Sequence, residues 1–167
     1  KEPGGRSVQQ IWTEVIAYRI ARLLRVPVPP AFLACDETTG AAGVLIEFFY
    51  GYGDLAEARF VHARDLFQAS QLPFDPDRGS LADNIRLSRM HGAPDARSWW
   101  AQAVAFDTLI GNTDRHTHNW GLLVHRSPGE QHLEHTLAPV FDNGSSLGAI
   151  IRDDDLHARM QRERFEQ

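Results

Sequence analysis

Apolar residues recur at helical spacing along the first part of the chain. Four of them fall on one face of a helix: Trp12, Ile16, Ile20 and Leu23. Ser7 stands where a helix N-cap is expected. The stretch 26–30 holds three prolines, which lack the backbone N–H that a helix needs. The pattern therefore predicts a helix from Ser7 to about Arg25.

Two short runs of apolar and β-branched residues follow this helix. They cover residues 31–35 and 43–49, and residues 36–40 between them are rich in turn formers. Such a run–turn–run order predicts two antiparallel strands. The glycines of the segment 51–53 then interrupt the regular pattern.

From Asp54 onward the pattern is helical. It is broken at residues 72–79, where prolines, aspartates and a glycine predict a loop. A further helix is predicted over residues 97–110, because Pro94 and Asp95 suit its start and Gly111 with Asn112 suits its end. A small mixed segment thus precedes a mainly helical one.

A predicted β-hairpin comes next and brings three polar residues together. Residues 120–125 and 131–137 read as its strands, joined by the turn 126–130. Asn119 immediately precedes the first strand, and Asp142 closely follows the second. In an antiparallel hairpin these two positions lie at the same end. Asp114, in the loop that enters the hairpin, belongs there too.

These residue types suit phosphoryl transfer. Magnesium prefers oxygen ligands, and the carboxylate of Asp142 with the amide oxygen of Asn119 would hold it while leaving positions for phosphate and water. A separate carboxylate must orient an acceptor hydroxyl and accept its proton, and Asp114 is the candidate. We expect His116 to brace the loop by hydrogen bonds. The sequence favours a kinase.

Composition and charge restrict the class of protein. The 167 residues suffice for one domain or two small lobes, and the net charge of −5 argues against a nucleic-acid-binding surface. The three arginines at positions 19, 22 and 25 read as the solvated face of the first helix. The single cysteine, Cys35, favours the cytoplasm. No apolar run reaches the roughly 20 residues that span a bilayer, and no signal peptide is recognisable.

Other interpretations of the same residues stay open at this point. Aspartate and asparagine are common in turns between a helix and a hairpin. A metal hydrolase would use the histidines at positions 116, 118, 132 and 135, but no recognised zinc-ligand spacing is present. A nucleophilic hydrolase is disfavoured, because Ser145 and Ser146 lack the Gly-x-Ser-x-Gly setting.

The motif resembles that of the HipA-like serine/threonine kinases, the toxin kinases of bacterial toxin–antitoxin pairs. Their pattern Asp-x-His-x-Lys-Asn, followed by an aromatic residue and Asp, is matched by Asp114, His116, Asn119 and the pair Phe141-Asp142. The resemblance implies that Asp114 is catalytic with His116 beside it, and that Asn119 and Asp142 bind magnesium. It implies ATP as cofactor, a protein Ser/Thr hydroxyl as acceptor, and a small DNA-binding antitoxin as partner.

Weaker similarities extend this resemblance from Lys1 to about Gly144. Lys1 is similar to an ATP-binding lysine and Glu14 to its acidic partner, while the main chain of Glu47 and Phe49 would bind adenine. His118 stands where the family has a lysine and would carry its phosphate contact in part.

The resemblance also implies a fold. We expect a two-lobed α+β, protein-kinase-like architecture, with an incomplete small lobe over residues 1–50 and a helical lobe over residues 51–167 that carries the catalytic hairpin. The phosphate-covering loop would precede Lys1, and further helices would follow Arg152. The order Asp-Arg-His-x-x-Asn also resembles phosphatidylinositol kinases, so a lipid kinase remains an alternative, as does a nucleotide-binding module without catalysis.

Overall fold

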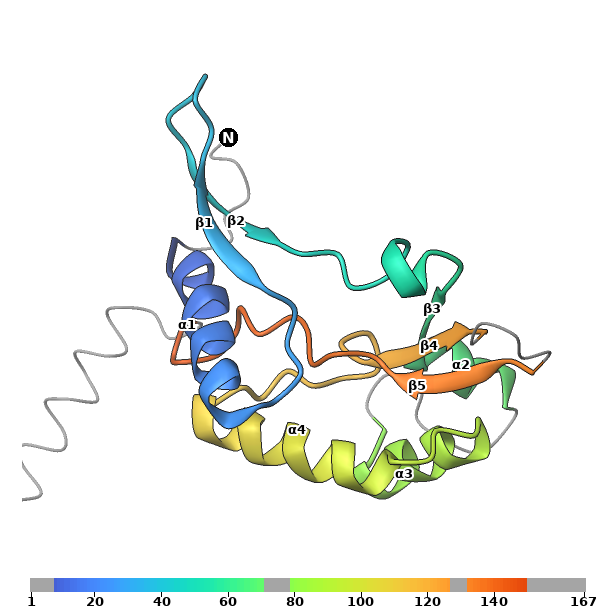
Figure 1. Cartoon of the computed structure of the whole chain (residues 1–167). Coiled ribbons are helices and arrows are strands. Elements are labelled where there is room, and N and C mark those ends of the chain that lie inside the picture. The colour runs from blue at the N-terminus through green and yellow to red at the C-terminus, as the bar shows by residue number, and fades with distance from the viewer. Residues whose placement is uncertain (1–7, 71–78, 127–131, 150–167) are drawn as a thin grey trace, which may run out of the picture.

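The computed structural model describes residues 8–70, 79–126 and 132–149, and shows a mixed α/β fold of helices and two small sheets (Figure 1). In chain order its elements are α1 (Val8–Leu24), β1 (Ala31–Cys35), β2 (Ala42–Ile46), the 3-10 helix η1 (Gly53–Leu55), β3 (Arg59–His62), α2 (Ala63–Ala69), α3 (Leu81–Met90), α4 (Ala96–Ile110), β4 (Gly121–His125) and β5 (Glu134–Leu137). Within the described residues, no helix is long and apolar enough to cross a membrane.

The predicted first helix is confirmed, but its predicted apolar face is not the buried one. Trp12 and Leu23 are 52% and 85% exposed, whereas Ala17 and Ala21 are fully buried. Small side chains let the helix approach its neighbours closely, and this close packing decides which face turns inward. The three arginines of the predicted solvated face are exposed, as expected.

Strands β1 and β2 form the predicted antiparallel pair, with Ala31 opposite Ile46 and Cys35 opposite Ala42. This hairpin projects from the rest of the molecule beside α1 (Figure 1). The second strand ends at Ile46 and not at residue 49 as predicted. The amide of Glu47 still donates to the carbonyl of Pro30 at 2.8 Å. The prolines at positions 29 and 30 have no backbone N–H, so the hydrogen bonds between the two strands do not continue beyond this pair.

The prediction of helix from Asp54 onward is wrong at its start. The segment instead forms η1 and then the strand β3, which pairs antiparallel with β4, Arg59 opposite Val124 and His62 opposite Gly121. Helix α2 begins directly after this strand. Most of the predicted loop at 72–79 lies outside the described residues.

The predicted second hairpin is confirmed as β4 and β5, in the order β3-β4-β5, with Leu122 opposite Leu137 and His125 opposite Glu134. The predicted start of its second strand, residue 131, lies outside the described residues. Gly121 has no room for a side chain, because an added Cβ would lie 2.3 Å from the carbonyl oxygen of Val61.

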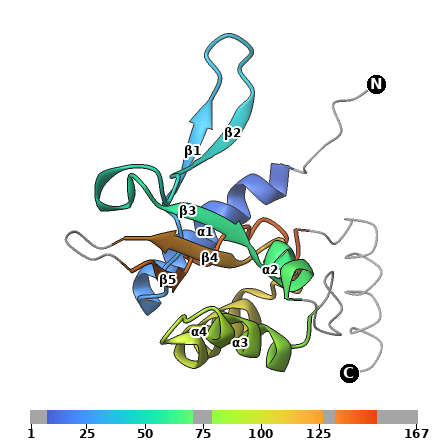
Figure 2. The same ribbon diagram turned by 90° about the vertical axis from the view of Figure 1, so that its right-hand side faces the viewer.

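The core lies between this sheet and the helices α3 and α4, which run along one side of it (Figures 1 and 2). The rings of Trp100 and Trp120 meet edge to face at 4.9 Å, and the indole N–H of Trp100 donates to the hydroxyl of Ser88. Helix α4, predicted over 97–110, begins one residue earlier and ends at Ile110, followed by the C-cap Gly111, whose φ of 65° is left-handed. The loop after Gly111 carries the predicted motif.

The predicted division into residues 1–50 and 51–167 stays a prediction. Helix α1 belongs to the first of these segments, yet Ala17 and Ala21 join the same core cluster as Trp100 and Phe106.

Candidate active site

A cavity of about 240 Å³ lies where α1, β2, the loop after α4 and the turn after β5 meet. Asp114, Asp142 and Glu14 all line it. A second cavity of about 290 Å³ shares Glu14 and Asp142 with the first and extends to the segment after β2. The acidic residues of the predicted motif therefore face a cleft made of two adjacent cavities that share part of their lining.

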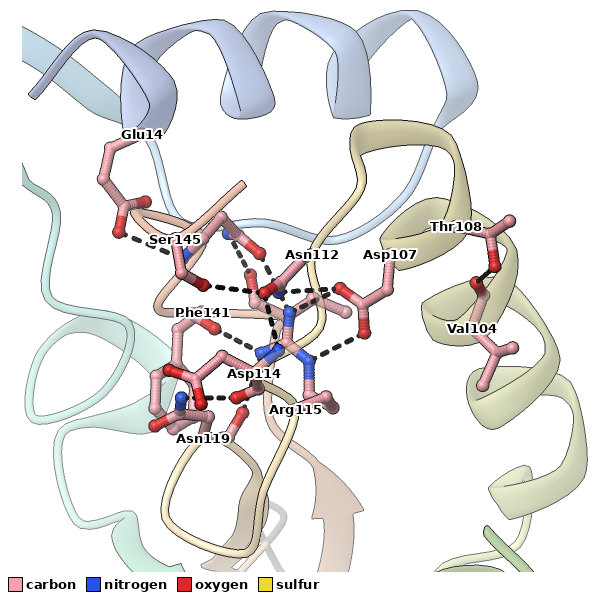
Figure 3. Close-up of polar contacts among 12 residues, drawn as sticks. Glu14, Val104, Asp107, Thr108, Asn112, Asp114, Arg115, Asn119, Phe141 and Ser145 are labelled. Carbon is pink, nitrogen blue, oxygen red and sulfur yellow. Dashed lines mark hydrogen bonds and ion pairs between the residues drawn. The ribbon is translucent and has the colours of Figure 1, made fainter. Parts of the chain in front are cut away.

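The guanidinium of Arg115 joins the two segments that carry the motif (Figure 3). Its Nε and Nη2 donate to the Asp107 carboxylate of α4 at 3.0 and 2.8 Å. The same side chain donates to the carbonyl oxygens of Asn119 and Phe141 and to Oδ1 of Asn143. Both charged side chains are about nine-tenths buried, so this is a shielded ion pair of matched fork geometry.

Asn112 fixes the start of the same loop. Its Nδ2 donates to Asp107 at 3.0 Å, and its Oδ1 accepts from the amide of Asp114 and the hydroxyl of Ser145 at 3.1 and 2.9 Å. The buried asparagine thus ties α4, the loop and the turn after β5 together (Figure 3). The backbone of Asp114 is held while its own carboxylate remains exposed.

The imidazole of His116 is oriented toward Asp114. Its Nδ1 accepts from the amide of His118 at 3.2 Å, so a neutral ring carries its proton on Nε2. That Nε2 lies 3.5 Å from Oδ1 of Asp114. The hydrogen bond from the amide of His118 lies within the loop, and the role expected of His116 stays a prediction.

Asn119 and Asp142 are the predicted magnesium ligands; Asp142 lines both cavities, whereas Asn119 is buried against Asp114. Nδ2 of Asn119 donates to the carbonyl of Asp114 at 2.8 Å, which leaves its Oδ1 without a hydrogen-bond partner among the described residues. The carboxylate of Asp142 also has no partner there, and its backbone is left-handed with φ of 58°. An amide oxygen and a carboxylate at one hairpin end fit a magnesium ion that completes its shell with phosphate and water.

Glu14 reaches this turn from α1. Its Oε1 accepts from the amide of Asn143 at 3.0 Å, and the hydroxyl of the neighbouring Thr13 donates to the carbonyl of Gly144 at 2.8 Å. Burial, and next the charge of Asp142, raise the pKa of the Glu14 carboxyl from 4.5 to about 7, against the opposing effect of the backbone N–H groups and Arg115. Lys1, its predicted partner, lies outside the described residues.

The segment predicted to bind adenine borders the second cavity. Glu47, Phe48 and Phe49 line it together with Phe141. Among the described residues, the carbonyl of Glu47 and the amide of Phe49 have no hydrogen-bond partner, so both backbone groups are available to a base. The Phe49 ring stacks on Phe141 at 5.5 Å, which ties this segment to the motif.

His118 contacts α2 through its ring and lines neither cavity. Its Nε2 accepts from Nη1 of Arg64 at 3.2 Å, and its carbonyl contacts Nδ1 of His62 at 3.1 Å. Pattern reasoning missed Arg64, His62, Arg115 and Asp107. The sequence offered a high density of polar residues around Asp114 as a signal. It did not single out these four residues, because each of them bonds a group in another segment of the chain.

The alternative hydrolase interpretations gain no support. In the part of the chain that the structure describes, no three histidine, cysteine or acidic side chains converge as the zinc site of a metal hydrolase would need. The hydroxyl of Ser145 donates to Asn112 and not to a histidine, and Ser146 is fully buried.

Comparison with known proteins supports the same conclusion about the fold. A family model described as the HipA-like C-terminal domain matches residues 3–166. The serine/threonine-protein kinase CtkA of Helicobacter pylori is 49% identical over 49 residues, which are 29% of this chain and 14% of that protein. The crystal structure of a Helicobacter pylori proinflammatory kinase CtkA matches with a TM-score of 0.73 and 22% identity, over 92% of this chain and 54% of the other. The chain thus spans about half of the solved relative and a small part of the curated one.

Proposed function

Because the chain belongs to the HipA-like C-terminal domain family, we propose that it is the core of a kinase that transfers the γ-phosphoryl group of ATP, with magnesium, to a protein Ser or Thr hydroxyl. The observation that carries this proposal is the arrangement of Asp114, Asn119 and Asp142 at one end of the β4–β5 hairpin. Asp114 and Asp142 line one cavity, and Asn119 lies against Asp114.

Each of these three residues has a proposed role that is compatible with its surroundings. Asp114, which is exposed and is not one of the proposed metal ligands, would accept the hydrogen bond of the acceptor hydroxyl and take up its proton, with His116 holding one carboxylate oxygen. Asn119 and Asp142 would hold magnesium, which neutralises charge on the phosphates. Arg115 would keep both ligands in place, since it bonds the main chain beside each.

The nucleotide would lie along the two adjacent cavities. The adenine would bond the carbonyl of Glu47 and the amide of Phe49, both unpaired among the described residues. Its phosphates would then extend toward Glu14 and Asp142, where the cavities meet. By family analogy Lys1 would pair with Glu14 and contact the phosphates, whereas the ring of His118 is bonded to Arg64 and lines neither cavity.

Family membership also suggests the biological setting. We infer a cytoplasmic toxin of a toxin–antitoxin pair, with a small DNA-binding antitoxin as partner and no direct binding of nucleic acid or membrane by the kinase. Co-expression of the full-length protein with the product of the neighbouring gene should yield a stable complex on size-exclusion chromatography. Separate elution of the two proteins would remove this inference.

The decisive experiment titrates the full-length protein with ATP in a calorimeter, with and without magnesium. We expect magnesium-dependent binding by the wild type and by Glu57→Gln, a matched loss of an exposed carboxylate outside the cleft, but not by Asp142→Asn. Asp114→Ala should bind ATP and fail to label a protein substrate with phosphate. Equal labelling by wild type and Asp114→Ala would refute the catalytic assignment, and labelling of lipid vesicles alone would favour the lipid kinase.

A further inference from the structure

The junction between β3 and α2 holds the loop that precedes β4 by four hydrogen bonds. Two are between backbones: Ala63 N–H to the carbonyl of Trp120, and Arg64 N–H to the carbonyl of Thr117, both 3.1 Å. In the other two, side chains bond His118. Nδ1 of His62 donates to the carbonyl of His118 at 3.1 Å, and Nη1 of Arg64 donates to Nε2 of His118 at 3.2 Å. The junction therefore grips His118 by both its main chain and its ring.

The chemistry of the partners fixes where the protons lie. A carbonyl oxygen only accepts, so Nδ1 of His62 must carry the hydrogen. A guanidinium only donates, so Nε2 of His118 must be the accepting nitrogen, and the ring carries its proton on Nδ1. In this arrangement the imidazole of His118 is neutral, and the positive charge beside it belongs to Arg64.

His118 is in turn connected to two residues of the site, His116 and Asn119. Its amide donates to Nδ1 of His116, the ring that faces Asp114. The next residue is Asn119, whose amide donates to the carbonyl of His116 at 2.9 Å. A shift of His118 would move the His116 ring and the Asn119 side chain together.

We propose that His62 and Arg64 are positioning residues for the catalytic loop: by gripping His118 they set the His116 ring against Asp114 and aim the Asn119 oxygen at the magnesium site. This inference rests on the proposed function for its catalytic part. Its structural part, the grip on the loop, can be measured without any activity. Both side chains are only partly buried, so a change there should alter the loop more than the stability of the fold.

A pair of isosteric variants tests the contact of His62. In His62→Asn the amide nitrogen takes the place of Nδ1 and can still donate to the carbonyl of His118, whereas in His62→Gln the amide lies near the position of Nε2 and cannot. Arg59→Ala, an exposed position on the same strand, is the control. Arg64→Met removes the donor to the His118 ring and keeps a long side chain.

The first readout is hydrogen–deuterium exchange of residues 114–121 in the full-length protein. We expect His62→Gln and Arg64→Met to exchange about 10-fold faster there than the wild type, the effect of one lost hydrogen bond, and His62→Asn and Arg59→Ala to match the wild type. The second readout is the magnesium concentration that half-saturates ATP binding, which should rise in the same two variants. In the transfer assay kcat should fall at least 10-fold while KM for ATP changes less than about 2-fold.

The outcomes separate this inference from the proposed function. Unchanged exchange in His62→Gln overturns the positioning role whatever the activity. Equal losses in His62→Asn and His62→Gln, with a lower melting temperature in both, show a structural role only and also overturn it. Faster exchange in His62→Gln and Arg64→Met but not in His62→Asn, in a protein whose wild type binds no ATP, confirms the grip on the loop and refutes the kinase proposal instead.

Discussion

Removal of the Arg115 guanidinium should destabilise the fold and the site together. The side chain makes five hydrogen bonds, two of them to the buried carboxylate of Asp107. Breaking a buried ion pair from one side costs about 3–5 kcal/mol, because the remaining charge is left without a partner. Domains of this size are stable by about 5–15 kcal/mol. We therefore expect Arg115→Met to lose about 4 kcal/mol and to remain folded at low temperature.

A double-mutant cycle with Asp107→Asn separates the ion pair from the other bonds of Arg115. Asparagine keeps the shape at position 107 and removes its charge. The double variant should lose at least 2 kcal/mol less than the sum of the two single variants, because it no longer buries an unpaired charge. Urea unfolding followed by tryptophan fluorescence measures this, since Trp100 and Trp120 are buried in the core.

Arg115→Lys tests the geometry with the charge retained. A lysine ammonium cannot form a fork on Asp107 and also reach the three other acceptors. We expect this variant to fold and to lose most magnesium-dependent ATP binding. A loss below 1 kcal/mol in Arg115→Met, strict additivity in the cycle, or undiminished ATP binding by Arg115→Lys would each refute the reasoning.

Three further predictions concern residues that hold the site. The pKa of the Glu14 carboxyl is about 7 in the folded protein against 4.5 ordinarily, so between these pH values the folded state keeps a proton that the unfolded chain releases. The free energy of unfolding should therefore fall by up to about 3 kcal/mol as pH rises from 4.5 to 7. Urea unfolding at several pH values should show this slope in the wild type and not in Glu14→Gln, and an equal slope in both would disprove the cause. Gly121→Ala should cost about 3 kcal/mol, because the added Cβ would overlap the Val61 carbonyl, and a melting temperature like that of the wild type would contradict it. Thr13→Val should cost about 1–2 kcal/mol through the lost bond to the Gly144 carbonyl, whereas Thr38→Val in the exposed β1–β2 turn should cost almost nothing.

Local patterns predicted the elements whose signals are local. Prolines and the glycine at position 111 marked the ends of α1 and α4, and the turn-rich stretches placed both hairpins. The strand β3 was missed because its four residues form a strand only through pairing with β4, some 60 residues later. The buried face of α1 was likewise set by its neighbours, since the larger apolar residues Trp12 and Leu23 remain exposed.

The candidate site likewise has a part that local patterns predicted and a part that they did not. The position of Asp114, Asn119 and Asp142 at one hairpin end followed from the order of the elements, and the structure places them there. The residues that hold these three in place could not be predicted from the order of the elements. Arg115 matters because α4 brings Asp107 to it and the turn after β5 brings Asn143, and neither contact leaves a mark in the local sequence.

The distribution of burial around the site argues for a preorganised centre. Asp114 and Asp142, the side chains proposed to meet acceptor and metal, are exposed, while the groups that hold their backbones are buried. The turn at 142–144 is gripped from α1 by Thr13 and Glu14 and from the opposite side by Arg115. Electrostatic stabilisation of a transition state works best when the charged groups need not reorganise during reaction. A turn fixed by buried contacts on both sides meets that requirement.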